Sequence, residues 1–175
     1  DLRQNVYFLE KNVSATYRWL RYIYISNIII NKKLLHNNEI WVDIGSYYGG
    51  VQSILKSKYQ NTTFFLVDFN HQLCRSYVYL KNIYPEVNHI LPDTINHIKD
   101  INSIEKGSIV YLKVKDFQKI NSLKVNLITN FFSFGEMKRN TFYSYFNSDI
   151  INNANILYLI NRFVSSPFFE KTYDS

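Results

Sequence analysis

The sequence is poor in the residues that cross-link a chain or interrupt its regular structure. It has a single cysteine, Cys74, among 175 residues, so no disulfide can form within the chain. Only five glycines and three prolines are present, and they form no flexible linker. Hydrophobic residues make up 46% and aromatic residues 17%, which excludes disorder as the main state. The length and composition therefore predict one globular domain with a substantial core.

Long apolar runs and runs of one charge are also missing. The most apolar stretch, residues 22–30, falls short of the roughly 20 residues that a membrane span needs. The first ten residues include Asp1, Arg3 and Glu10, where a secretory signal would be apolar. The net charge of +6 and the pI near 9.2 come from dispersed Lys and Arg, so we expect no nucleic-acid partner. We therefore expect a cytoplasmic protein without a membrane span.

Short apolar segments alternate with helical patterns along the chain. Apolar runs predict strands at 40–44, 63–67, 87–91, 109–114, 125–131 and 156–160. Apolar residues three and four positions apart predict helices at 4–35, 51–59, 71–84, 95–104 and 141–152, with Asn70 as the cap of the third. This alternation predicts an α/β domain with a mainly parallel sheet and flanking helices. We expect an N-terminal helical segment, residues 1–38, to pack on a core of residues 39–175.

A glycine-containing loop follows the first of these strands and opens a helix; its sequence is Val42-Asp43-Ile44-Gly45-Ser46-Tyr47-Tyr48-Gly49-Gly50. Glycine lets a ligand approach the backbone closely, and the following helix offers free N–H groups. A nicotinamide cofactor is disfavoured, because Tyr47 replaces a dinucleotide-loop glycine and Asp43 would face a pyrophosphate. Asp43 suits a cationic ligand such as S-adenosylmethionine, and Asp68, at the end of the second strand, can accept both ribose hydroxyls. The alternative is a tight turn with solvent-exposed acids.

Three segments together resemble a known family. They are Leu20-Arg21-Tyr22-Ile23 with the glycine loop, Leu66-Val67-Asp68 with Ser76-Tyr77-Val78-Tyr79-Leu80, and Asn130-Phe131-Phe132-Ser133-Phe134-Gly135-Glu136-Met137. The sequence resembles the class I S-adenosylmethionine-dependent methyltransferases and, more narrowly, the sugar O-methyltransferase family of bacterial polysaccharide gene clusters. The resemblance implies a Rossmann-like methyltransferase fold over residues 39–175. It also implies transfer of a methyl group to a hydroxyl of a sugar or glycan precursor, with S-adenosylhomocysteine as the product.

The resemblance and the position of each residue suggest roles in the site. The expected cofactor-binding residues are Asp43, Gly45, Ser46, Tyr47, Gly49, Asp68, Phe69 and Asp93, of which Asp93 could equally cap a helix. Glu136 is the candidate general base, Asn130 a second catalytic residue, and Ser133 and Phe134 the substrate-binding residues. Glu136 has an alternative role in complementing a helix dipole. We predict no metal site, because no pair of histidines has metal-ligand spacing.

Two departures from the family pattern accompany this resemblance. Tyr47 stands where the family often has glycine. The family also continues into an antiparallel strand pair beyond the position of Asn161, so we expect the C-terminal strands of the sheet to be missing here. The residues alone do not identify a sugar. A methyltransferase with a non-sugar small-molecule acceptor and a catalytically inactive Rossmann-like binding module therefore stay as alternatives.

Overall fold

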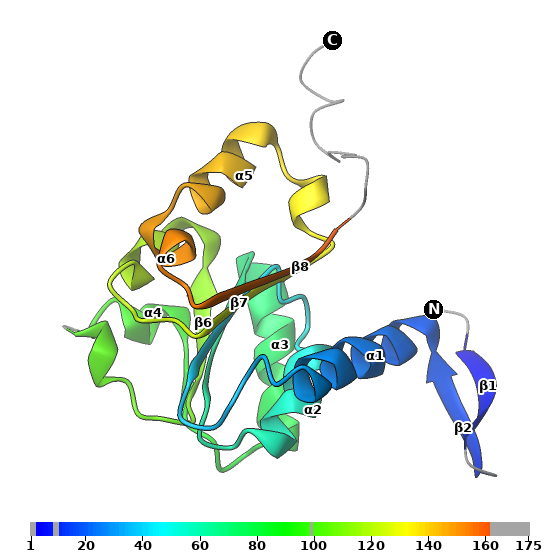
Figure 1. Ribbon diagram of the computed structural model, residues 1–175. Coiled ribbons are helices and arrows are strands. Elements are labelled where there is room, and N and C mark those ends of the chain that lie inside the picture. Colours follow the sequence, from blue (N-terminus) through cyan, green and yellow to red (C-terminus); the bar gives the residue numbers. More distant parts are fainter. Residues whose placement is uncertain (1–2, 9–10, 99, 162–175) are drawn as a thin grey trace.

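The centre of the molecule is a six-stranded, wholly parallel sheet (Figure 1). The structure is a computed structural model that describes residues 3–8, 11–98 and 100–161. The strand order is β5-β6-β4-β3-β7-β8. The strands are β3 (Ile40–Ile44), β4 (Thr63–Asp68), β5 (His89–Ile90), β6 (Ile109–Lys113), β7 (Leu127–Phe131) and β8 (Ile156–Ile160). The predicted α/β fold with a parallel sheet is therefore confirmed.

Helices cover both faces of this sheet. They are α1 (Tyr17–Asn31), α2 (Gly50–Lys58), α3 (Asn70–Ile83), α4 (Pro92–Ile95), α5 (Arg139–Phe146) and α6 (Asp149–Asn152), with 3-10 helices η1 (Ile101–Ser103), η2 (Val114–Ile120) and η3 (Phe134–Glu136). Helices α1, α2 and α3 pack on one face, and η2, α5 and α6 pack on the other. None of the helices among the described residues has the length and apolar character that a membrane crossing requires.

Alternation along the strands divides the core into two layers. Trp41 of β3 and Phe64 of β4 face α1, α2 and α3, whereas Val42 and Phe65 face η2, α5 and α6. All four side chains are essentially buried. Burial on both faces explains why these strands are almost continuously apolar in the sequence. The acid Asp43 follows the same alternation and lies on the α1 side.

Strand β3 is the switch point of the sheet, because later strands are added on both sides of it. Strand β3 pairs with β4 on one side and with β7 on the other. The segment after β3 builds the sheet outward through β4, β6 and β5, and the chain then returns to add β7 and β8. A parallel sheet binds ligands at such a switch point, outside the carboxyl ends of its strands. The loops after β3 and β7 therefore flank the expected binding crevice.

The N-terminal segment differs from the predicted helix over 4–35. Residues Arg3–Phe8 and Lys11–Thr16 form the antiparallel strands β1 and β2, and the helix occupies Tyr17–Asn31 alone (Figure 1). Thr16 fixes this boundary, because its side chain accepts a hydrogen bond from the backbone N–H of Trp19 at 3.3 Å. The division into segments 1–38 and 39–175 stays a prediction, and the expected lack of C-terminal strands concerns residues outside the described part.

Three further predicted elements need correction. Asn70 is the first residue of α3 rather than its cap, a position that Phe69 takes without a side-chain hydrogen bond. The helix predicted over 95–104 is replaced by α4, which ends at Ile95, and by η1. The helix predicted over 141–152 is two helices, since Ser148 ends the first by donating to the carbonyl of Tyr145 at 2.5 Å.

The short strand β5 is not next to β4 in the sheet, although it follows β4 in the chain. The predicted strand over 87–91 contracts to His89–Ile90, and β6 lies between it and β4. His89 is held by the backbone carbonyl of Tyr84 at 3.0 Å and by the hydroxyl of Tyr111 at 2.8 Å. Because β6 lies between them, β5 forms the edge of the sheet rather than pairing with β4.

Candidate functional site

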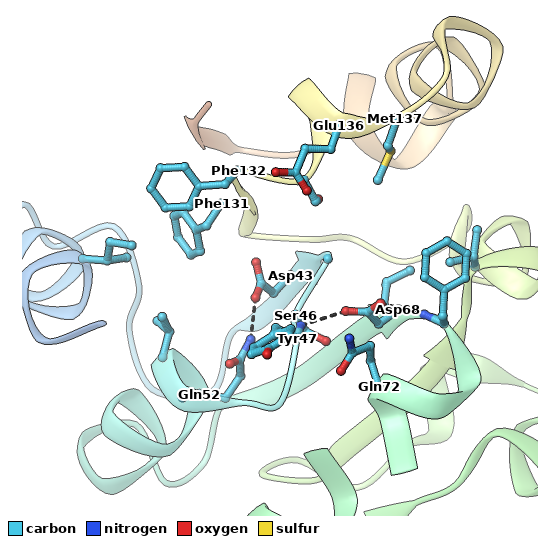
Figure 2. A pocket seen from close by; sticks show the side chains of 18 of the residues that line it. Asp43, Ser46, Tyr47, Gln52, Asp68, Gln72, Phe131, Phe132, Glu136 and Met137 are labelled. Atoms are coloured by element: carbon cyan, nitrogen blue, oxygen red, sulfur yellow. Dashed lines mark hydrogen bonds between the residues drawn. The ribbon is translucent and has the colours of Figure 1, made fainter. Parts of the chain in front are cut away.

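A cavity of about 680 Å³ opens at the carboxyl ends of β3, β4 and β7 (Figure 2). Its wall consists of the glycine loop and the start of α2, the segment joining β4 to α3, the segment after β7, and parts of α1 and α5. This volume is typical of small-molecule sites. The cavity lies at the switch point of the sheet, where the topology predicts a ligand site.

The glycine loop is held against the end of β4 by Asp68. The backbone N–H of Tyr47 donates to Asp68 Oδ2 at 2.7 Å, and that of Phe69 donates to Oδ1 at 2.7 Å. A carboxylate offers about four lone-pair positions, so Asp68 keeps acceptor capacity for a ligand. Burial raises the pKa of Asp68, against these two backbone hydrogen bonds, which lower it. Asp68 thus both shapes the loop and lines the cavity.

Tyr47 adopts a backbone conformation that normally favours glycine. Its φ is +54°, in the left-handed region, which glycine adopts without steric cost. Its carbonyl accepts a hydrogen bond from Ser76 Oγ at 2.6 Å, and its hydroxyl accepts one from Arg18 at 3.2 Å. Strained backbone of this kind is often found at binding sites. Tyr47 also lines the cavity.

The carboxylate of Asp43 is held by a chain of buried hydrogen bonds. The indole N–H of Trp41 donates to Thr129 Oγ1 at 2.8 Å, and the Thr129 hydroxyl donates to Asp43 Oδ1 at 2.6 Å. Gln52 Nε2 donates to Asp43 Oδ2 at 2.5 Å (Figure 2). Burial, aided by the charge of Asp68, raises the pKa of Asp43 to about 7, although the hydrogen bonds from Thr129 and Gln52 lower it. Asp43 is therefore no solvent-exposed turn residue.

The raised pKa of Asp43 makes stability depend on pH. In the unfolded chain this carboxyl titrates near 3.8, so between about pH 4 and pH 7 the folded protein keeps a proton that the unfolded chain has lost. The free energy of unfolding should fall as the pH rises through this window, by roughly 4 kcal/mol at most. Urea unfolding at pH 4.5 to 8 should show this decline in the wild type and a flatter profile in Asp43→Asn. Parallel profiles in the two proteins would contradict this assignment.

The segment after β7 meets the glycine loop at very short range. A Cβ on Gly45, whose φ is +78°, would lie 2.2 Å from Ser133 Oγ. Asn130 fixes this contact: its Nδ2 donates to the carbonyl of Ile44 at 2.7 Å and to Ser133 Oγ at 2.5 Å, and its Oδ1 accepts from the N–H of Phe134 at 3.0 Å. Asn130 is fully buried and lies behind the cavity wall, so the structure favours a positioning role over the predicted catalytic contact.

The two residues predicted to bind the substrate, Ser133 and Phe134, differ in their position relative to the cavity. Phe134 is buried against Phe142 and Tyr145 of α5 and lies outside the cavity lining, so the structure gives its predicted substrate contact no support. Phe131 and Phe132 line the cavity instead, and Phe132 has a φ of +72°. Ser133 also lines it, as predicted from the sequence.

Glu136 lies on the cavity side of this segment. Figure 2 shows its side chain reaching from the chain after β7 toward the space above Asp43. Met137, which follows it, also lines the cavity. The position is compatible with the predicted role of Glu136 as a base and less so with the alternative role in complementing a helix dipole, since Met137 and Lys138 stand between Glu136 and the first residue of α5.

Two of the predicted cofactor-binding residues lie outside the cavity lining. Gly49 has a φ of +92°, and a Cβ there would lie 2.8 Å from Leu80, so this glycine allows α2 and α3 to approach one another. Asp93 is highly exposed and forms an ion pair with Lys113 at 3.1 Å. Because β6 separates β5 from β4, Val114 after β6 lines the cavity where Asp93 was expected.

The wall contains polar atoms that are buried without a partner. Ser46 Oγ, Gln72 Oε1 and the Tyr145 hydroxyl are among five such atoms in the described residues, and all three belong to cavity-lining residues. Buried polar groups normally form hydrogen bonds, and an unsatisfied one costs about 1–3 kcal/mol. Three of the five residues that carry such atoms therefore lie around one cavity.

Sequence reasoning missed several residues of the site. Gln72 lies in the first turn of α3, four residues after the strand-end residue Asp68, and this closeness in sequence could have suggested a second ligand contact (Figure 2). Tyr145, Val114 and Arg18 come from helices distant in sequence, so no local pattern indicates them. Phe69, which was predicted, lines the cavity and stacks on His71, with ring centres 6.0 Å apart.

Comparison with known proteins finds similarity among solved structures. No protein-family model and no curated protein matches the sequence. Among solved structures, the chain is similar to a candidate sarcosine dimethylglycine methyltransferase from Galdieria sulphuraria, with 12% identity and a TM-score of 0.43. The match covers 74% of this chain and 43% of that one, so this chain spans less than half of that protein. Within the described residues, no group of three or more His, Cys, Asp or Glu could hold a metal ion.

Proposed function

We propose that this protein is an S-adenosylmethionine-dependent O-methyltransferase. The observation that carries the proposal is the grouping of Asp68 with three polar residues, Ser46, Gln72 and Tyr145, that line one cavity and each have a polar atom without a partner. This cavity lies at the switch point of a parallel sheet, beside a glycine loop. An adenosine group offers ribose hydroxyls and a polar base, which match such a wall.

The residues present fit this donor in both charge and shape. Asp68 and Gln72 would hold the ribose hydroxyls, and Ser46 and Tyr145 would contact other polar atoms of the nucleoside. The exposed ring of Phe69, at the mouth of the cavity, would pack against the base. Asp43 would face the positively charged end of the donor, where a cation favours the ionised carboxylate.

Glu136 is the proposed general base for the acceptor hydroxyl. When bound, the donor supplies a methyl group already activated by its sulfonium. The protein must then position the acceptor oxygen in line and remove its proton. Glu136 extends into the cavity on the β7 side, facing the β3 and β4 strand ends across it (Figure 2). Asn130 acts through Ser133 by fixing the segment that carries Glu136.

The acceptor class proposed here is a sugar or glycan precursor. Phe131 and Phe132 provide an aromatic surface suited to the apolar face of a sugar ring, and Ser133 provides a hydroxyl beside them. These residues lie on the same segment as Glu136. The resemblance of this segment to the sugar O-methyltransferase family supports the same proposal.

Ser46 and Ser26 offer a matched test of donor binding. Both hydroxyls are buried without a partner, but only Ser46 lines the cavity. Each serine-to-alanine variant should stabilise the ligand-free protein by about 1 kcal/mol, because an unsatisfied group is removed. Only Ser46→Ala should weaken S-adenosylhomocysteine binding, by roughly 3- to 10-fold in calorimetric titration. Equal affinities for the two variants would argue against contact of Ser46 with the donor.

A Glu136→Gln variant tests the catalytic proposal. Loss of a general base should lower the rate of methyl transfer by about 10²- to 10⁴-fold. Transfer of a labelled methyl group to a panel of sugars would measure this, with S-adenosylhomocysteine affinity expected to stay within about twofold of wild type. Glu105→Gln is the control, because Glu105 is exposed and outside the cavity lining. An equal loss in both variants, or none in Glu136→Gln, would count against Glu136 as the base.

A further inference from the structure

Two arginines of α1 each pack over an aromatic ring of the cavity wall. The guanidinium of Arg18 lies 5.0 Å from the ring centre of Tyr47, and that of Arg21 lies 4.6 Å from the ring centre of Phe132. The two arginines are three residues apart and therefore share a face of α1. Tyr47 follows β3 and Phe132 follows β7, so the pairs flank the switch point of the sheet.

Both rings belong to residues with left-handed backbone conformations, which side chains other than glycine rarely adopt. The packing of α1 itself does not require both arginines, since Tyr22, Ile25 and Ile29 already hold this helix on the core. Packing of the helix therefore does not explain why an arginine lies above a ring in the cavity wall, and a role in binding is the other explanation.

Of the two arginines, Arg21 gives the stronger indication of a ligand. It lines the cavity and is exposed, and within the described part of the chain it has no carboxylate partner. A guanidinium packed on a ring still has N–H donors around its edge, arranged to bind a carboxylate or phosphate through two bonds. The geometry thus leaves a fixed cation facing the cavity beside Phe132.

Arg21 lies at the part of the cavity where the methyl acceptor would bind. Figure 2 shows Phe131 and Phe132 on one side of Asp43, with Asp68 and Gln72 on the other. Under the proposed function, the nucleoside of the donor lies with Asp68 and Gln72. The acceptor must then approach from the segment that carries Phe132 and Glu136. Arg21 contacts the ring of Phe132 and belongs to that side.

We propose that the acceptor carries an anionic group, a carboxylate or a phosphate, and that Arg21 binds it. This inference rests on the proposed function and narrows its substrate class to acidic or phosphorylated sugars. The aromatic surface of Phe131 and Phe132 would hold the ring of the sugar, while Arg21 would fix its orientation relative to Glu136. A neutral sugar would lose the charge-assisted hydrogen bonds to Arg21.

Binding of matched sugars to protein saturated with S-adenosylhomocysteine tests this proposal. The probes are glucose, glucuronate and glucose 1-phosphate, and the corresponding galactose series, titrated calorimetrically. At least one charged sugar should bind 10-fold or more tightly than its neutral parent. Comparing the uronate with the phosphate distinguishes the two sources of the charge. Arg21→Gln should lose about 10-fold in affinity for the charged sugar, and Arg21→Lys should lose less.

Arg75→Gln is the matched control. Arg75 also lies over the ring of Tyr47, at 5.8 Å, but it is exposed on α3 and outside the cavity lining. This variant removes the same charge and should leave sugar affinity unchanged. Thermal unfolding of all variants shows whether each is folded, and Arg21→Lys keeps the charge if Arg21→Gln is unstable.

Three results would overturn the proposal. They are equal or absent binding of all six sugars by the wild type, an unchanged affinity in Arg21→Gln, and an equal loss in Arg75→Gln. A loss of S-adenosylhomocysteine affinity in Arg21→Gln would also overturn it, because Arg21 would then hold the donor's own carboxylate. Absence of S-adenosylhomocysteine binding by the wild type would instead refute the proposed function, and the two failures are thereby distinguished.

Discussion

An Asp68→Ala variant is expected to lose at least about 100-fold in affinity for S-adenosylhomocysteine. Hydrogen bonds from two hydroxyls to one carboxylate are worth about 1.5–3 kcal/mol each, and alanine removes both. The variant also loses the acceptor for the backbone N–H groups of Tyr47 and Phe69, so the glycine loop loses its anchor. Calorimetric titration of both proteins measures the change.

Two further variants separate these contributions. Asp68→Asn keeps one oxygen acceptor for the loop but removes the charge, so its affinity should fall between those of the wild type and Asp68→Ala. Asp93→Ala removes an exposed carboxylate that lies outside the cavity lining and should bind as the wild type does. A larger effect at Asp93 than at Asp68 would reverse the assignment of the ribose site.

A Lys56→Met variant is expected to lose about 3 kcal/mol or more of stability. The Lys56 side chain is almost wholly buried, and its ammonium donates to the carbonyls of Gln60, Thr62 and Gly107 at 2.8, 2.9 and 2.5 Å. Methionine matches the shape but leaves these acceptors without a donor. In a chain of this length the melting temperature should fall by roughly 6–12 °C.

The neighbouring Lys58 provides the control for this substitution. It belongs to the same last turn of α2 but is exposed, so Lys58→Met should change stability by no more than about 0.5 kcal/mol. Thermal unfolding of the three proteins tests the comparison. Similar melting temperatures for Lys56→Met and the wild type would show that the three carbonyls find other partners at little cost.

Local patterns in the sequence were sufficient to predict the strands of the sheet and to single out Asp43 and Asp68 as candidate site residues. Strands β3, β4 and β7 are apolar because both of their faces are buried, and this signal does not depend on their neighbours in space. Asp43 and Asp68 interrupt or end such strands, which made them visible as site residues. The backbone at Tyr47 confirms that this position suits glycine.

The remaining features depend on contacts between distant segments. The placement of β6 between β4 and β5 moves Asp93 away from the cavity, and nothing in the sequence around Asp93 indicates that strand order. Phe134 and Phe132 are two residues apart in an aromatic run, yet only the packing of α5 decides that Phe134 is buried. The three carbonyls around Lys56 likewise come from two loops that are far apart in sequence, Gln60 and Thr62 before β4 and Gly107 before β6.

We propose that the cavity beside Asp43 and Asp68 binds S-adenosylmethionine. Isothermal titration of the wild-type protein with S-adenosylhomocysteine, and with NAD as the comparison ligand, tests it most directly. We expect saturable binding of S-adenosylhomocysteine with one site per chain and no measurable binding of NAD. Binding of NAD alone, or of neither ligand by a folded protein, would contradict the claim and the site assignments that depend on it.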